Sequence, residues 1–129
     1  FSFTDYDLAV ASKNNLVGVI NKEGEEILSF EYTYIEIINK NRFIVIDQDN
    51  NANIIDENEN ILTSTSYQSI ISTALPNLFI VSKEENDTIY YGLIDNNGNK
   101  IIELQYLNIM VEDHYILVQS DTEYLIKWL

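Results

Sequence analysis

The chain repeats a segment of roughly 36 residues, and this repetition limits its possible folds more than any other feature. Residues 18–27 (GVINKEGEEI) align with residues 92–101 (GLIDNNGNKI), with both glycines and both isoleucines in register. Residues 53–62 (NIIDENENIL) form a more divergent middle copy. Units of this size pack mainly on their sequence neighbours. We therefore expect three consecutive copies. Their approximate ranges are residues 17–51, 52–88 and 89–122.

The ends of the copies and the ends of the chain fit the same unit. The copies are expected to close with equivalent apolar triplets at residues 43–45 (FIV), 79–81 (FIV) and 115–117 (YIL). Residues 1–16 are expected to hold the last strand of an earlier copy, and residues 123–129 the first strand of a later one. These partial copies either belong to a longer array or pair with each other to complete one unit.

Each copy is expected to contain four β-strands, which we call strands a to d. In the third copy, short runs rich in Ile, Leu, Val and Tyr are separated by Asn, Asp and Gly, a pattern typical of strands joined by turns. No window keeps a helical spacing of apolar residues for long enough to predict a helix. The polar residues 84–88 (EENDT) predict a longer loop before the third copy. The predicted fold class is all-β, with tandem β-hairpin repeats in an antiparallel, solenoid-like meander.

Glycine recurs at two places in each well-formed copy. Gly18 and Gly92 lie in strand a, whereas Gly24 and Gly98 lie in the turn between strands a and b. In this turn an Asn or Asp side chain bonds the backbone that follows it, and glycine supplies a positive φ. In the middle copy Glu59 takes the turn-glycine position, which predicts a strained or remodelled turn.

A tyrosine recurs between strands b and c of every copy. The three equivalent residues are Tyr32, Tyr67 and Tyr106. A tyrosine repeated at a strand junction is best explained as a corner residue, with its ring in the core and its hydroxyl bonded to a backbone group.

These residues resemble the bacterial WG repeat family, whose pattern is aromatic-Gly-hydrophobic-Ile-Asp, two polar residues and a second glycine, followed later by Tyr and, three positions on, Ile. The third copy fits best, through Tyr91, Gly92, Leu93, Ile94, Asp95, Gly98, Ile101, Tyr106 and Ile109. The family's Trp is replaced by Val17, Ala52 and Tyr91 in the three copies, and its Pro after strand b is absent. The resemblance implies a β-rich module used in interactions or at surfaces, and it supplies no catalytic residues.

The charge of the chain excludes several classes of partner. Seven Lys and Arg stand against 21 Asp and Glu, which gives a net charge of −14. With no basic cluster, binding to nucleic acid or to an anionic membrane surface is disfavoured. The absence of Cys excludes disulfides, a Cys-ligated zinc site and a Cys nucleophile. No stretch is apolar enough to span a bilayer, and the first residue, Phe1, indicates a processed or excised chain.

Three groups of side chains could carry chemistry, and each has a simpler explanation. Asp and Asn alternate in residues 47–51, 56–60 and 95–99, as in calcium loops, but the same residues are ordinary turn formers. His114 beside two acids could act in acid–base catalysis, but no nucleophile motif accompanies it. The acidic clusters at residues 23–26 and 84–87 lack the signs of a catalytic cleft. We therefore predict no catalytic residues, no metal site and no cofactor.

The remaining candidates for binding are tyrosines outside the corner position. Tyr6, Tyr34, Tyr90 and Tyr124 could form an exposed aromatic surface for a protein or glycan. The predicted function is a non-enzymatic protein–protein interaction module with an acidic surface and a basic protein partner. The alternatives are an acidic immunity protein or nucleic-acid mimic that inhibits a basic toxin, a carbohydrate-active enzyme, and a structural spacer.

Overall fold

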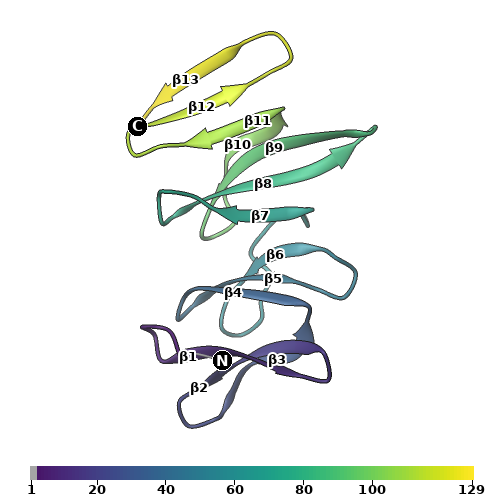
Figure 1. The fold of residues 1–129 in the computed structure, drawn as a ribbon, viewed down its shortest axis with the longest axis vertical. Helices are drawn as coiled ribbons and strands as arrows, with labels where there is room; N and C mark the ends of the chain where they lie inside the picture. The colour runs from purple at the N-terminus through teal and green to yellow at the C-terminus, as the bar shows by residue number, and fades with distance from the viewer. Residues whose placement is uncertain (1–2) are drawn as a thin grey trace. The chain divides into compact units, whose positions relative to one another are not determined.

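The computed structural model describes residues 3–129, so the first two residues of the predicted partial copy 1–16 lie outside it. These residues form thirteen β-strands and no helix (Figure 1), which confirms the all-β prediction. In particular, none of the described residues form a helix that could cross a membrane. The chain divides into two compact halves, one ending at Ser66 and the other comprising Tyr67–Leu129. Each half contains two antiparallel sheets.

The N-terminal half contains two three-stranded meanders. The first sheet has the strand order β1-β2-β3 and the second has the order β4-β5-β6. Their strands are β1 (Leu8–Lys13), β2 (Leu16–Asn21), β3 (Glu26–Tyr32), β4 (Tyr34–Asn39), β5 (Arg42–Ile46) and β6 (Ala52–Ile55).

The C-terminal half contains a four-stranded and a three-stranded meander. The strand orders are β10-β9-β8-β7 and β11-β12-β13. Their strands are β7 (Ser69–Ser72), β8 (Leu78–Glu85), β9 (Thr88–Asp95), β10 (Lys100–Tyr106), β11 (Asn108–Val111), β12 (Tyr115–Gln119) and β13 (Tyr124–Trp128).

Each sheet combines strands from two successive copies. Strands c and d of the first copy, β4 and β5, pair with β6, which is strand a of the second copy. In the same way β8 ends the second copy and pairs with β9, the first strand of the third. At the chain ends, β1 pairs with β2 and β13 pairs with β12, as expected for partial copies. The alternative in which the two ends of the chain pair with each other stays a prediction.

The strand register places corresponding residues of the three copies in equivalent positions. Ile20, Ile55 and Ile94 each lie in strand a opposite a strand-d residue of the preceding copy. Each is followed directly by the Asx residue that starts the turn to strand b. The amide after each corner tyrosine also makes the same bond to strand d. These backbone pairs are Thr33–Ile46, Gln68–Ser82 and Leu107–Gln119, at 2.7–2.8 Å.

The predicted closing triplet of the third copy is displaced by one residue. Strand c pairs Ile35 with Val45 in the first copy, and the equivalent pairs are Ile70–Val81 and Ile109–Val118. The third triplet is therefore residues 116–118, instead of 115–117. A shift of one residue moves a side chain to the other face of a strand, which explains why Ile116 and Val118 are buried whereas Tyr115 is not.

The core of each half lies between its two sheets. In the N-terminal half, Val19 and Leu28 from the first sheet pack against Phe43, Val45 and Ile55 from the second. In the C-terminal half, the equivalent cluster is formed by Leu93 and Ile102 from one sheet and Ile109, Ile116 and Val118 from the other. Burial of such apolar side chains provides the main stabilisation of each half.

Residues 84–88 extend a hairpin, and the prediction of a longer loop there is wrong. β8 and β9 remain paired up to Glu85 and Thr88. Only Asn86 and Asp87 form the turn, both with positive φ (50° and 65°). Asn and Asp tolerate this backbone and suit a two-residue hairpin turn.

The middle copy lacks the predicted strand b and retains only an isolated bridge between Ile55 and Ile61. In the other copies strand b crosses directly over the strand-a glycine. A Cβ atom on Gly18 or Gly92 would lie 2.7 Å from a strand-b carbonyl oxygen. Asn53 occupies this position in the middle copy, and its amide instead bonds Thr63 and Ser66. The side chain of Asn53 thus explains the missing strand.

Candidate functional site

Four acidic or amide-rich turns share one hydrogen-bonding pattern. In each turn the Oδ1 atom of the first residue accepts bonds from the backbone N–H groups two and four residues later, at 2.8–3.0 Å. The first residues are Asn21, Asp47, Asp56 and Asp95. Hydrogen bonds lower the pKa of Asp56. The side-chain bond from Asn60 contributes most, and the backbone amides of Asn60 and Asn58 contribute less. These bonds confirm the turn interpretation of the Asp and Asn pattern. Within residues 3–129, no group of three or more His, Cys, Asp or Glu is placed to hold a metal.

Glu59 has a positive φ of 64° at the turn position where Gly24 and Gly98 have 81° and 80° and Asn50 has 65°. Glycine and asparagine tolerate this backbone, whereas glutamate does not suit it. The predicted strain is thus confirmed. Its carboxylate accepts three hydrogen bonds from β3. The donors are the Ser29 amide (2.8 Å), the Ser29 hydroxyl (3.0 Å) and the Tyr32 hydroxyl (2.8 Å). The side chain that strains the turn therefore connects the second copy to strand b of the first.

The corner tyrosines differ in what their hydroxyl groups contact. The Tyr32 hydroxyl donates to Glu59, so the predicted bond to a backbone group is wrong for this residue. Tyr67 is almost fully buried, and its hydroxyl has no hydrogen-bond partner among residues 3–129. The rings of Tyr32 and Tyr106 pack at the edge of the core of their own half. The predicted packing of the tyrosine rings in the core therefore describes these corners better than the predicted bond from the hydroxyl to a backbone group.

We expect Tyr32 to make the stability of the protein sensitive to alkaline pH. Burial raises the pKa of Tyr32 above its ordinary value of 10.0, and the bond to Glu59 and the charge of Glu59 raise it further. A raised pKa in the folded state gives a contribution to stability that is complete below pH 10 and is lost as the pH rises toward the folded-state value. We expect the free energy of unfolding, measured with denaturant, to fall above pH 10. The fall should be less steep in Tyr32→Phe and in Glu59→Gln; equal slopes in all three proteins would contradict this explanation.

The four tyrosines predicted to bind a partner are divided between the halves. Tyr6 and Tyr34 are 46% and 47% exposed and lie in the N-terminal half, where the Tyr34 hydroxyl contacts Glu36 at 3.3 Å. Tyr124 lies in β13 of the C-terminal half and is 64% exposed, whereas Tyr90 is only half-buried in β9. Their role in binding stays a prediction.

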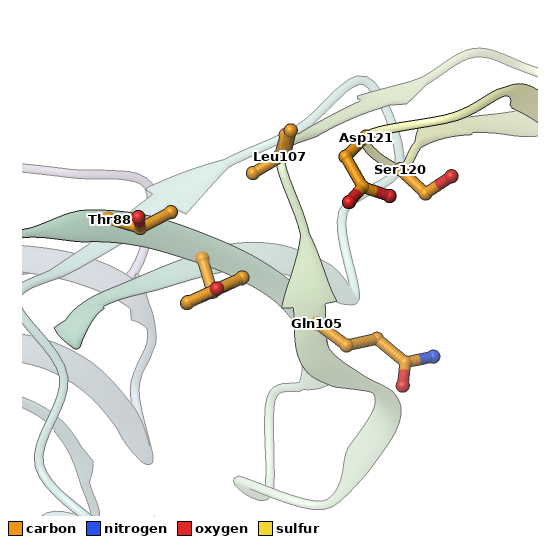
Figure 2. Close-up of a pocket in the computed structure, with 6 residues that line it drawn as sticks. Thr88, Gln105, Leu107, Ser120 and Asp121 are labelled. Carbon is orange, nitrogen blue, oxygen red and sulfur yellow. The ribbon is translucent and has the colours of Figure 1, made fainter. Parts of the chain in front are cut away.

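An open pocket of about 370 Å³ lies in the C-terminal half. The extended hairpin contributes Thr88 and Tyr90, and the segment from β10 to β11 contributes Gln105 and Leu107. The turn after β12 completes the lining with Ser120 and Asp121; Figure 2 shows the last two side by side and Gln105 across from them. The lining contains one carboxylate, so this pocket lacks the carboxylate pair on which glycoside hydrolysis commonly depends.

The other residues considered for catalysis lie on turns or at hairpin ends. His114 is exposed in the turn between β11 and β12, next to the exposed Glu112 and Asp113. The acids at residues 23–26 and 84–87 are also exposed. Each therefore occupies a solvated turn or hairpin end.

Comparison with known proteins identifies the repeated segments. The model of the WG containing repeat matches residues 18–51 and residues 91–111. These two segments are similar to the WG repeat. They contain strands a to d of the first copy and strands a to c of the third. No curated protein matches the chain.

The segment between the two matched segments is where the repeat geometry changes. It contains Asn53 and Glu59 at the two glycine positions, and it lacks strand b. The sequence predicted the exception at Glu59 but not the exception at Asn53. The signal for the latter was available, because Asn53 aligns with Gly18 and Gly92.

Outside the two matched segments, the structure exposes apolar residues of β13 that the sequence did not predict as binding residues. Tyr124 was predicted, whereas Ile126 and Trp128, which are 53% and 73% exposed, were not. Their spacing of two residues was the available signal, since alternate residues of a strand share one face.

Proposed function

We propose that this protein is a non-enzymatic interaction module that binds a basic protein through its acidic surface. The β-hairpin repeats supply a framework whose turns and hairpin ends carry exposed acidic side chains. Repeat arrays generally bind through extended surfaces.

The observation that carries the proposal is an excess of exposed acid without a matching number of cations. Sixteen of the 21 Asp and Glu are exposed, and none is buried. Even if every Lys and Arg were paired with one acid, fourteen acids would lack a cation. The excess occurs in both halves, with twelve acids and four cations up to Ser66 and nine acids and three cations after it. A basic partner would neutralise this charge, and long-range attraction would accelerate its association.

The proposal predicts a partner with the opposite charge and a strong dependence on ionic strength. Affinity capture from a native cell lysate at low salt, followed by elution with salt, should yield a basic protein. Its affinity for the purified chain should fall about tenfold or more between low salt and about 0.5 M salt, because salt screens exposed charges. An acidic partner, or an affinity that salt leaves unchanged, would contradict the proposal. Oligolysine and oligoglutamate peptides provide the matched test of charge alone.

A further inference from the structure

The sheet of β11, β12 and β13 has one face packed in the core and one face that is exposed among the described residues. Ile109, Ile116 and Val118 point into the core of the C-terminal half. Because successive residues of a strand point to opposite faces, the residues between them lie on the other side. We call this side the outer face. Its apolar and aromatic residues are Met110, Tyr115, Leu117, Tyr124, Ile126 and Trp128.

The register places these side chains in adjacent rows. Met110 pairs with Leu117, and Leu117 pairs with Ile126, so the three form a row across the sheet. In the next row Tyr115 pairs with Trp128, and their rings are 5.5 Å apart and tilted by 59°. Met110, Ile126 and Trp128 are 46%, 53% and 73% exposed. A contiguous surface of this composition is typical of an interaction site.

Equivalent rows elsewhere in the chain are covered by another sheet. The pair Leu117–Ile126 corresponds to Val10–Val19 in the N-terminal half and to Ile80–Leu93 in the C-terminal half. Both of these rows pack into the core of their half, and Val19 and Leu93 are fully buried. The outer face thus has the position and the composition of a face that the fold buries.

The charges around the outer face indicate what kind of surface would cover it. Glu112 and Asp113 lie in the turn at one end of the sheet, and Asp121 and Glu123 lie in the turn at the other end. All four are exposed. A second copy of the chain would bring like charges together, whereas a cationic rim would complement them. Lys127 does not offset these acids on the outer face, because it lies in register with Ile116 on the inner side.

We propose that the outer face of β11–β13 is the docking site for a protein whose surface has an apolar centre bordered by Lys or Arg. This inference rests on the proposed function, because it assigns the basic partner to one face of the molecule. Trp128 and Tyr124 would be its main anchors, since exposed aromatic residues supply much of the binding energy at such sites.

Trp128 makes the proposal directly measurable, because it is the only Trp in the chain. The probe is a synthetic peptide with an Ile- and Val-rich centre and lysines at both ends. The control peptides carry glutamates at the ends or serines in the centre. We expect only the first peptide to shift the fluorescence of Trp128 to shorter wavelength, because only its apolar centre would remove the indole from water.

A pair of variants separates the outer face from other apolar residues. Ile126→Ser should weaken binding of the lysine-ended peptide by about tenfold. Ile71→Ser is the matched control, because Ile71 lies in the edge strand β7 and is 52% exposed. This variant should bind within about twofold of the original chain. Circular dichroism of both variants would show that the fold is retained.

The outcomes distinguish this inference from the proposed function. One outcome is salt-sensitive binding that does not change Trp128 fluorescence and is equally strong in the Ile126→Ser variant. This outcome would overturn the docking site but would leave the proposed acidic interaction module intact. Failure of every lysine-containing peptide to bind would overturn both. A dimer in sedimentation, with Trp128 buried as the protein concentration rises, would overturn the basic partner and assign the face to a second copy.

Discussion

Replacing Gly92 with alanine should lower the free energy of unfolding by about 3 kcal/mol, at the upper end of the cost of overpacking a rigid core. A Cβ atom at this position would lie 2.7 Å from the carbonyl oxygen of Ile102 and 3.1 Å from two further backbone atoms of strand b. Backbone atoms cannot rotate away as a side chain can, so β10 itself would have to shift. Denaturant unfolding followed by circular dichroism would measure the loss, and Gly18→Ala should behave similarly because its Cβ would lie 2.7 Å from the carbonyl oxygen of Leu28.

Gly24→Ala is the matched control for Gly92→Ala. Gly24 has a φ of 81°, but no atom lies within 4 Å of the position that its Cβ would take. Its substitution should cost only about 1 kcal/mol, from the positive φ alone. If the two variants lost the same stability, close approach of strand b would not be the reason for glycine in strand a.

The sequence predicted most reliably those features that depend on residues close together in the chain. The turn between strands a and b is one example, because Asp95 bonds Asn97 and Asn99 within a few residues. The turn glycines and the equivalence of Ile20, Ile55 and Ile94 are of the same kind. Local geometry and a two-residue alternation are sufficient to predict them.

The features that the sequence did not predict depend on contacts between strands. Loss of strand b in the middle copy follows from the side chain of Asn53. This effect can be predicted only if it is known that strand b crosses over that position in the other copies. The polar residues at the end of the β8–β9 hairpin predict a loop, although they extend the hairpin. Cross-strand pairing decides its structure. The outer face was partly missed because exposure of Trp128 and Ile126 depends on which sheet faces are covered.

Replacing Glu59 with alanine should lower the free energy of unfolding by about 2 kcal/mol, the cost expected when donors lose a charged acceptor at a partly exposed site. The Ser29 amide, the Ser29 hydroxyl and the Tyr32 hydroxyl would all lose their bond to the carboxylate. Glu59→Gly should be more stable than Glu59→Ala by about 1 kcal/mol, because glycine relieves the positive φ of 64°. Denaturant unfolding at neutral pH would measure both differences.

A double-mutant cycle would separate the hydrogen bond from the backbone strain at Glu59. Tyr32→Phe removes the hydroxyl that donates to Glu59 and leaves the ring at the edge of the core. If the bond stabilises the fold, the effects of Glu59→Ala and Tyr32→Phe should be less than additive, with a coupling energy of about 1 kcal/mol. Additive effects would mean that the carboxylate acts through Ser29 alone. A Glu59→Gly variant as stable as the original chain would show instead that the bonds to β3 only offset the strain of placing glutamate in a glycine turn.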